Sequence, residues 1–424
     1  MGLLLISFLV LLMLGVPIFI ALAGSSLLYT HFLTRVPDFV VLHRMAGGVD
    51  SFPLLAVPFF ILAGNLMNSA GITNRIFDFA IAAVGWLRGG LGHVNVVASV
   101  IFAGMSGTAV ADAGGLGTIE IKAMRDHGYK TDFSVGITAA SSTIGPIIPP
   151  SLPMVIFGVM ANVSIGQLFA AGIVPGLLVA LALMIYTSWY ARRYGIGRDQ
   201  AFKLKTLGRT FVSAVPAMMT PVIIIGGMSF GIFTPTEAAI AACAWALLLG
   251  TVLYRSLSWK HFYKISMETI ETTAAVLIIV GAASLFGWVL TITQVTQAVT
   301  DLLLSISRDP LVLLLLINVL LLVVGCFMET IAAISILVPV LMPVVNAVGI
   351  DPVQFGVVMV LNLMIGLLTP PVGMVLFILS RVANISFDRT VRAVVPFLVP
   401  LLLVLLLVSI FPAITLTIPS WIYR

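Results

Sequence analysis

Long apolar runs, separated by short polar or basic loops, alternate along the whole chain. Roughly 20 apolar residues are enough for a helix to cross a bilayer, so the pattern predicts an all-α polytopic membrane protein. No charged residue precedes Arg35, and we therefore expect the first run to be a retained spanning helix rather than a cleaved signal peptide. The runs lie at about 2–29, 51–68, 76–87, 171–190, 211–233, 237–254, 270–292, 311–327, 353–380 and 394–418.

One motif occurs twice within these runs, 221 residues apart. Residues 144–150 read I-G-P-I-I-P-P and residues 365–371 read I-G-L-L-T-P-P, and each motif is followed by an apolar run and then by A-N-V-S or A-N-I-S. Proline lacks a backbone N–H and clashes with the preceding turn, so both motifs should break a helix at membrane depth. Irregular backbone at that depth is tolerated where it lines a cavity, which points to a transporter's binding site. The alternative is a pair of simple kinks in an ordinary helical bundle.

The composition excludes a soluble fold. Of the 424 residues, 60% are hydrophobic and 9% are charged, and the mean hydropathy is +1.19. The two cysteines, Cys243 and Cys326, lie in apolar runs without a C-x-x-C spacing, and we expect them to be packing residues. The five histidines fall at expected helix ends or loops, so no transition-metal site is predicted.

The net charge of +5 comes from basic residues that gather in alternate loops. If these loops are cytoplasmic, only Arg75, Arg308 and Arg424 lie outside, as the positive-inside rule favours. Both chain termini are then predicted on the periplasmic side. No basic patch is interleaved with aromatic residues, so nucleic-acid binding is not expected.

The positions of the basic loops also predict that each element of the second half crosses the membrane in the opposite direction to its counterpart in the first half. The predicted division is a first repeat at 1–191, a basic cytoplasmic linker at 192–210 and a second repeat at 211–424. Each repeat should contain a re-entrant hairpin and a discontinuous helix, at about 92–127 and 132–160 in the first and at about 311–347 and 353–383 in the second. Inverted-topology repeats of this kind are common in alternating-access transporters.

Polar residues gather at the expected tips of both hairpins. The first tip, residues 104–115, reads G-M-S-G-T-A-V-A-D-A-G-G, and the second, residues 324–330, reads V-G-C-F-M-E-T. Carboxylates at membrane depth cost at least roughly 2.5 kcal/mol and usually serve a function. We therefore predict a substrate site from the polar residues of the two tips, which are Ser106, Thr108, Asp112, Glu329 and Thr330.

Each tip is expected to face the bend of its own half. Na⁺ is a hard cation that prefers several neutral oxygens, which hydroxyls and unwound carbonyls supply. Helix N-termini near Ser151 and Val372 would direct partial positive charge toward an anionic substrate. The predicted arrangement is two cation sites that flank one anion site, although isolated hydroxyls often bond only to preceding carbonyls. The candidate cation ligands are Ser106, Ser141, Ser142, Gly145, Ile148, Gly366, Thr369 and Pro370.

Two other acidic residues are expected to be structural. Thr234, Pro235 and Glu237 match a capping box at the start of a helix. Glu120 lies beside Lys122 in the sequence and is expected to be near water.

Enzymatic and channel functions are weaker interpretations. The G-M-S-G sequence at 104–107 matches the nucleophile pattern of rhomboid-type intramembrane proteases, in which serine needs a histidine base on another helix. No histidine lies centrally in a later expected span, so we predict no enzyme activity. A passive channel could also use broken helices, but it would not need two hairpins of opposite orientation.

Five motifs occur in order along the chain: V-P-F-F-I-L-A-G-N-L-M (57–67), S-G-T-A-V-A-D (106–112), G-P-I-I-P-P-S (145–151), G-I-F-T-P-T-E-A (231–238) and L-T-P-P-V-G (368–373). Together they resemble the large membrane subunit of tripartite ATP-independent periplasmic (TRAP) transporters, and the likeness covers essentially the whole chain. The resemblance implies a Na⁺-driven importer of organic acids, such as sialic acid or a C4-dicarboxylate, with Na⁺ as coupling ion and no cofactor.

The resemblance also implies two partners, a small four-helix membrane subunit and a soluble periplasmic binding protein that delivers substrate at the bacterial inner membrane. It implies an elevator mechanism, in which hairpins and broken helices move together against a scaffold. By motif, Gly145 falls in the first cation site, and Gly325, Gly366 and Thr369 fall in the second. The alternative is a stand-alone Na⁺/dicarboxylate symporter of the same broad fold, which would carry S-N-T signatures that this chain lacks.

Overall fold

The computed structural model describes residues 2–34, 36–69 and 71–423, and every regular element within these ranges is helical. Eight of the helices in these ranges are long and apolar enough to cross a bilayer. The all-α polytopic fold is therefore confirmed. Arg424, which was expected on the periplasmic side, is not among the described residues.

The first apolar run forms two helices, so the prediction of a single span over residues 2–29 is wrong. Helix α1 (Gly2–Met13) and helix α2 (Ile18–Leu33) pack against each other. Gly15, with a φ of 73°, and Pro17 separate them, because a left-handed glycine and a proline together reverse the chain. Both helices, with α3 (Phe39–Val49), pack on α14 (Trp259–Ile292) and enclose a small apolar core.

The rest of the first repeat follows the expected order of scaffold helices, hairpin, broken helix and long return helix. Its elements are η1 (Phe52–Leu55), α4 (Ala56–Ser69), α5 (Ile72–Val84), α6 (Gly90–Ser106), α7 (Ala109–Gly114), α8 (Leu116–Asp126), α9 (Thr131–Ser142), α10 (Leu152–Ala161) and α11 (Ile165–Arg193). Helices α6 to α8 form the hairpin, and α9 and α10 are the two halves of the broken helix.

The second repeat has the same order. Its elements are α12 (Leu204–Ser229), α13 (Pro235–Leu248), the π-helical turn η2 (Leu249–Leu253), α14, α15 (Val295–Ile306), α16 (Pro310–Phe327), α17 (Thr330–Ala347), α18 (Pro352–Gly366), α19 (Met374–Ala383), α20 (Phe387–Ile410) and α21 (Ala413–Ile422). Helices α16 and α17 form the second hairpin, and α18 and α19 form the second broken helix. The capping box predicted at Thr234 and Glu237 is confirmed at the start of α13.

Equivalent positions of the two repeats have equivalent local structures. Thr108 and Glu329, which are 221 residues apart, are the N-caps of α7 and α17 at the two hairpin tips. Both bends contain a cis prolyl bond, Pro149–Pro150 in one and Pro370–Pro371 in the other. After each bend, an asparagine in the left-handed conformation ends the helix and a serine caps the next one, at Asn162 and Ser164 and again at Asn384 and Ser386.

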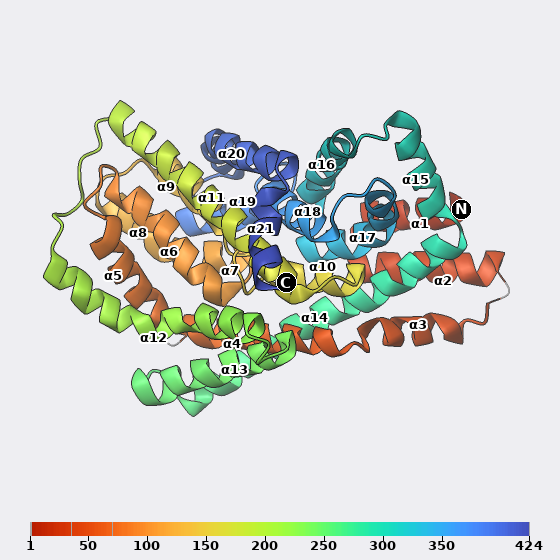
Figure 1. Ribbon diagram of the computed structural model, residues 1–424, viewed down its shortest axis with the longest axis horizontal. Coiled ribbons are helices and arrows are strands. Elements are labelled where there is room, and N and C mark those ends of the chain that lie inside the picture. Colours follow the sequence, from red (N-terminus) through yellow and green to blue (C-terminus); the bar gives the residue numbers. More distant parts are fainter. Residues whose placement is uncertain (1, 35, 70, 424) are drawn as a thin grey trace.

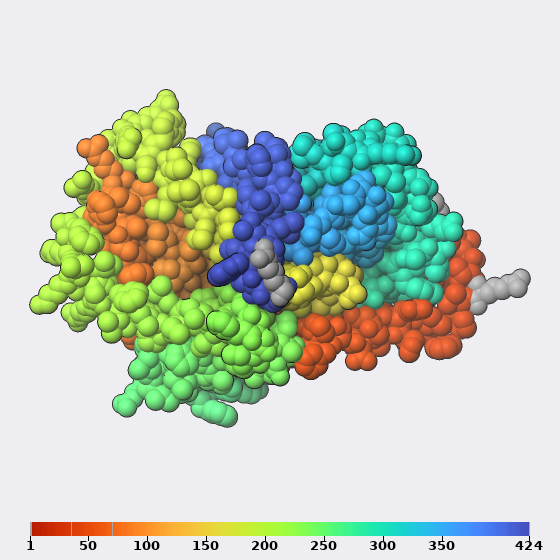
Figure 2. Space-filling model, in the orientation of Figure 1, coloured from red at the N-terminus to blue at the C-terminus, as the bar shows by residue number. Residues whose placement is uncertain are grey.

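The first hairpin lies on the left of the molecule and the second right of its centre, with α18 and α19 of the second broken helix between them (Figure 1). The halves interlock, because α7 of the first hairpin packs against α19, and α17 of the second packs against α10. Helices α2, α3, α4, α12 and α13 follow one long border of the molecule (Figures 1 and 2). Helix α4 packs against α13, and α12 packs against both α5 and α13. Helices α4, α5, α12 and α13 therefore form a packing group separate from the hairpins and broken helices, which is called the second packing group below.

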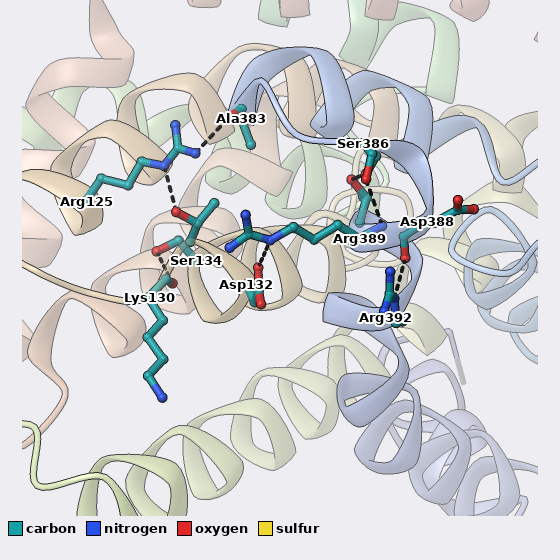
Figure 3. Close-up of polar contacts among 11 residues, drawn as sticks. Arg125, Lys130, Asp132, Ser134, Ala383, Ser386, Asp388, Arg389 and Arg392 are labelled. Carbon is teal, nitrogen blue, oxygen red and sulfur yellow. Dashed lines mark hydrogen bonds and ion pairs between the residues drawn. The ribbon is translucent and has the colours of Figure 1, made fainter.

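A polar cluster joins the two halves at one end of the broken helices (Figure 3). Arg125 of α8 donates from Nη2 to the carbonyl oxygen of Ala383 over 2.6 Å. Asp132 of α9 forms an ion pair with Arg389 of α20, with 2.6 Å between Oδ1 and Nε. Polar contacts therefore join the first hairpin to the second broken helix and the first broken helix to α20.

The connection between the repeats is shorter than the predicted linker 192–210, because α11 ends at Arg193 and α12 begins at Leu204. The connection packs against the turn that joins α5 to α6, where the N–H of Gly89 donates to the carbonyl oxygen of Gly197 over 2.9 Å. Asp199 accepts hydrogen bonds at Oδ2 from the backbone N–H of Leu91, over 2.8 Å, and from the Tyr129 hydroxyl, over 2.6 Å. The linker thus holds the N-terminus of the first hairpin.

Candidate functional site

The tip of the first hairpin lies against the bend of the first broken helix. Gly107 turns the chain with a φ of 62°, and a Cβ at this position would lie 2.8 Å from the carbonyl oxygen of Pro150. A Cβ on Gly145 would lie 3.5 Å from Ser106 Oγ and 3.6 Å from the Thr108 carbonyl oxygen. The polar residues of this tip and the opened backbone of its own bend are therefore neighbours.

The second tip meets its bend even more closely. A Cβ on Gly366 would lie 2.6 Å from the Cα of Gly325, so these two backbones are in direct contact. The carbonyl oxygen of Cys326 accepts hydrogen bonds from the N–H groups of Val372 and Gly373, over 3.2 and 3.3 Å. The Thr369 hydroxyl lies 2.9 Å from Cys326 Sγ. Cys326, which was expected only to fill space, thus links the tip to the bend.

Several of the predicted site residues have buried oxygens that lack a hydrogen-bond partner within the described part of the chain. These atoms are Ser106 Oγ and Asp112 Oδ2 at the first tip and Thr330 Oγ1 at the second. A buried polar atom without a partner is costly and usually has a ligand or a functional reason. The side chains at these positions therefore suit an oxygen-seeking ligand.

Other predicted ligands already have protein partners. Ser142 donates to the carbonyl oxygen of Ala139 over 2.8 Å, which is the local back-bonding considered as an alternative for such hydroxyls. Thr369 donates to Gly366 over 2.8 Å. Ile148 is buried and Pro370 is exposed, so at these two positions the backbone carbonyl would be the ligand atom. Ser141 donates to a side chain on the first hairpin, which is described below.

The two acidic residues of the tips differ in their surroundings. Asp112 is 2% exposed on the short helix α7. Glu329 is half-buried, and its Oε2 caps α17 by accepting from the N–H groups of Ile331 and Ala332, over 2.9 and 3.2 Å. The ion pairs formed within residues 2–34, 36–69 and 71–423 involve neither carboxylate. Within these ranges, no basic side chain therefore pairs with either carboxyl group.

A cavity of about 230 Å³ opens at the first tip, between the hairpin and the helices of the second packing group. Ser106 and Thr108 line it from the tip, and Leu152 lines it at the start of α10. Ser151 caps that helix by accepting from the Met154 N–H over 3.3 Å, so α10 begins at the predicted position. The cavity therefore contains hydroxyl groups and a helix N-terminus, whose partial positive charge favours anions.

The opposite wall contains polar residues that the sequence interpretation did not identify. They are Asn65 and Asn68 of α4 and Thr272 of α14. Asn65 donates to Thr269 Oγ1 over 3.1 Å, and Asn68 accepts from the Thr73 hydroxyl over 3.2 Å. Isolated amides inside an apolar helix were the available signal, because polar residues at membrane depth usually face a cavity or another helix.

The prediction that Glu120 lies near water is wrong. Glu120 is 1% exposed and accepts a hydrogen bond at Oε2 from Asn95 Nδ2 over 2.6 Å. It occupies the face of α8 that packs against α6 and α9, opposite to the face of its sequence neighbour Lys122. His93 lies in the first turn of α6, as expected for a residue at a helix end, but it is buried at 2% exposure, and its Nε2 lies 3.2 Å from Ser188 Oγ.

Comparisons with known proteins identify similar chains along nearly the full length. The sequence model of the family described as tripartite ATP-independent periplasmic transporter, DctM component, matches residues 5–414. The sialic acid TRAP transporter large permease protein of Vibrio cholerae is 50% identical over 411 residues, which cover 96% of this chain and 95% of that protein. The sialic acid TRAP transporter permease protein of Haemophilus influenzae is 43% identical, over 98% of this chain and 68% of that protein.

A solved structure shares the fold at low sequence identity. The YdaH transporter of Alcanivorax borkumensis, whose crystal structure is described as having an unusual topology, superposes with a TM-score of 0.64 and 14% identity. The superposition covers 92% of this chain and 97% of that chain. At this identity the likeness describes the fold alone.

Proposed function

This chain belongs to the DctM component family as the large membrane subunit of a TRAP transporter, and we propose that it imports an organic acid by using a sodium gradient. Two relatives are named as sialic acid transporters, so sialic acid is the first substrate to test, ahead of C4-dicarboxylates. The observation that supports the proposal most strongly is the contact of each hairpin tip with the bend of its own half, beside buried oxygens without partners.

The substrate anion would occupy the cavity at the first tip. Thr108 and Asn68 offer hydrogen-bond donors from opposite walls, and Leu152 marks the N-terminus of α10. Among the described residues, no lysine or arginine lines this cavity, so hydroxyls, amides and the helix N-terminus would hold the carboxylate. We retain Asp112, Glu329 and Thr330 as proposed substrate-site residues.

The residues of the two bends fit a monovalent hard cation, because they combine neutral oxygens with carboxylates nearby that form no ion pair in the described part of the chain. Bound Na⁺ would supply positive charge that balances the acidic tips and favours an anionic substrate. The first site would use Ser106, Ser141, Ser142, Gly145 and Ile148. The second would use Gly325, Gly366, Thr369 and Pro370.

Transport would proceed by an elevator movement. The hairpins and broken helices pack on one another, with α6 against α9, α16 against α18 and α10 against α17. Helices α4, α5, α12 and α13 pack together as the second group, which would be the scaffold. The cavity lies between the two groups, where such a movement would expose it to each side in turn.

The proposed complex contains two partners, a small four-helix membrane subunit and a periplasmic binding protein that delivers the substrate. The Haemophilus relative is longer than the matched region, which covers 68% of its length, and the proposed small subunit would correspond to the remainder. The complex would lie in the bacterial inner membrane, with the C-terminus of this chain on the periplasmic side. The reversal at Gly15 removes the single span that placed the N-terminus on that side as well.

Uptake of labelled sialic acid into proteoliposomes tests the proposal. We expect uptake only when this chain, the small subunit and the binding protein are all present and Na⁺ is higher outside. Uptake of free substrate by this chain alone would support the stand-alone symporter. Equal flux in both directions without a Na⁺ requirement would instead indicate a channel.

A further inference from the structure

Each hairpin contains a buried asparagine on its first arm, at Asn95 in α6 and at Asn318 in α16. Each asparagine is hydrogen-bonded to the residue that lies four positions before the glycine of the bend. That residue is Ser141 in the first half and Asn362 in the second, and these two positions are separated by the same 221 residues as the bends. The two contacts therefore occupy equivalent places next to the proposed cation sites.

In the first half, the contact leaves the oxygen of Ser141 available. The Ser141 hydroxyl lies 2.6 Å from Asn95 Oδ1 and 3.2 Å from the Thr138 carbonyl oxygen, and both partners only accept hydrogen bonds. The one hydroxyl hydrogen of Ser141 is therefore donated to these acceptors. No donor among the described residues reaches Ser141 Oγ, so both of its lone pairs are open to another ligand.

Glu120 fixes the orientation of the Asn95 amide. Asn95 Nδ2 donates to Glu120 Oε2 over 2.6 Å and to Thr138 Oγ1 over 2.7 Å. An ionised Glu120 accepts hydrogen bonds and cannot donate them, which holds the amide nitrogen of Asn95 toward Glu120 and the amide oxygen toward Ser141. Glu120, Asn95 and Ser141 thus form one directed chain of hydrogen bonds.

In the second half, the hydrogen bonds between the two asparagines leave the amide oxygen of Asn362 available for a ligand. Asn362 Nδ2 donates to Oδ1 and to the backbone oxygen of Asn318, over 2.8 and 2.9 Å. Asn362 is fully buried, and its own Oδ1 has no hydrogen-bond partner within the described residues. Ser409 orients Asn318, since it accepts from Asn318 Nδ2 over 2.9 Å while its hydrogen goes to the Leu405 carbonyl.

We propose that Asn95 and Asn318 are positioning residues that hold the oxygens of Ser141 and Asn362 free for cations, and that Asn362 is a cation ligand of the second bend. The proposal rests on the Na⁺ coupling proposed above. It adds Asn362 as a ligand, Asn95 and Asn318 as positioning residues, and Glu120 as the group that orients Asn95. Ser409 has the corresponding orienting role in the second half.

The role of Asn95 in the first half is tested by removing its amide and by exchanging the amide and carboxyl groups of Asn95 and Glu120. Asn95→Leu removes the group that accepts from Ser141 and donates to Glu120, and it should weaken Na⁺ binding at least tenfold. The double variant Asn95→Asp/Glu120→Gln should bind Na⁺ within about threefold of the wild type. In that variant, the glutamine introduced at position 120 donates to one oxygen of the aspartate introduced at position 95, whose other oxygen still accepts from Ser141. Failure of the double variant to recover would overturn the role of Asn95.

Removal of the free oxygen tests the second half. Asn362→Leu should raise the Na⁺ concentration needed for half-maximal uptake at least tenfold, while uptake at saturating Na⁺ stays within about threefold. The matched control is Asn346→Leu, because Asn346 is exposed on α17. An unchanged Na⁺ requirement in Asn362→Leu would overturn its role as a ligand. Where this variant does not fold, Asn362→Ser, which keeps a hydroxyl oxygen, should retain Na⁺ binding, and complete loss in that variant would contradict the proposal.

The direct readout is Na⁺ binding to the purified subunit without substrate, followed as the rise in Tm with NaCl at constant ionic strength in choline chloride. Effects on folding alone appear in the Tm without Na⁺, whereas the proposal concerns the Na⁺ concentration at the midpoint of the rise. A wild-type chain with neither Na⁺ stabilisation nor Na⁺-dependent uptake would refute the proposed function itself. A Na⁺-dependent wild type with unaltered variants would refute only this inference.

Discussion

Gly325 and Gly366 are in direct backbone contact where the second hairpin crosses the end of α18, and a Cβ on Gly366 would lie 2.6 Å from the Cα of Gly325. Backbone atoms on both sides cannot rotate away as a side chain could. The contact therefore fixes the distance between the tip of this hairpin and the bend that it faces.

Gly366→Ala should consequently separate the tip from the bend. Overpacking of a close contact costs about 1–3 kcal/mol, and we expect a lower Tm and at least a tenfold loss of Na⁺-dependent uptake. The control is Gly226→Ala in α12, where an added Cβ would meet no atom of the described residues within 4 Å and helix propensity should improve. Wild-type uptake by Gly366→Ala would contradict the proposed cation site.

Asn68→Asp should impair substrate binding without impairing the fold. Asp keeps the oxygen that accepts from the Thr73 hydroxyl, but it places a negative charge in the cavity. Two like charges about 4 Å apart repel by about 4 kcal/mol at an effective dielectric constant of about 20. We expect the KM for the organic acid to rise at least tenfold while the Na⁺-induced Tm shift is unchanged, and Asn346→Asp should alter neither value. Normal uptake by Asn68→Asp would place the substrate elsewhere.

Asp199→Ala should loosen the linker from the first hairpin. The change removes the acceptor of the Tyr129 hydroxyl and the closer of the two acceptors of the Leu91 N–H, and we expect a loss of about 2 kcal/mol. Tyr129→Phe should cost about 1 kcal/mol alone, and the two losses should not add, because Asp199, Tyr129 and Leu91 share one hydrogen-bond network in which Tyr129 is the second acceptor of the Leu91 N–H. Chemical denaturation of the purified subunit measures the three values, and strictly additive losses would argue against a shared contact.

The Tyr129 contact should also persist at alkaline pH. Burial, and then the hydrogen bond to Asp199, raise the pKa of Tyr129 well above its usual range. A raised pKa in the folded state contributes stability below the unfolded value of about 10, and that stability is lost as pH rises through the folded value. The difference in stability between the wild type and Tyr129→Phe should therefore be constant from about pH 6 to 9.

Cysteine labelling should determine the orientation of the chain in the membrane. Cys243 is buried and Cys326 is half-buried, so the wild type should label weakly with a membrane-impermeant maleimide. In intact spheroplasts we expect labelling of Arg308→Cys, and labelling of Lys203→Cys only after lysis. The reverse pattern would show that the positive-inside assignment is inverted.

Local rules were sufficient for much of the fold. The prolines at 149–150 and 370–371 lie in the two bends, and the hairpin tips fall within the expected segments. These features follow from the fixed φ of proline, the missing N–H and the length of apolar runs, which act within a few residues. The prediction of one helix over residues 2–29 was wrong at Gly15, because the hydropathy of a segment shows that lipid or protein surrounds it but not whether the chain reverses within it.

The sequence by itself determined the membrane class, the inverted repeat and the polar tips, because these depend on local chemistry and on a repeated pattern. Only the tertiary structure determined which groups meet across helices. It buried Glu120 beside Asn95 and brought Asn318 to Asn362, although 25 and 44 residues separate these pairs. It also placed Asn68 in the cavity wall. The position of a polar residue in an apolar run shows that it needs a partner, but only the packing of helices supplies one.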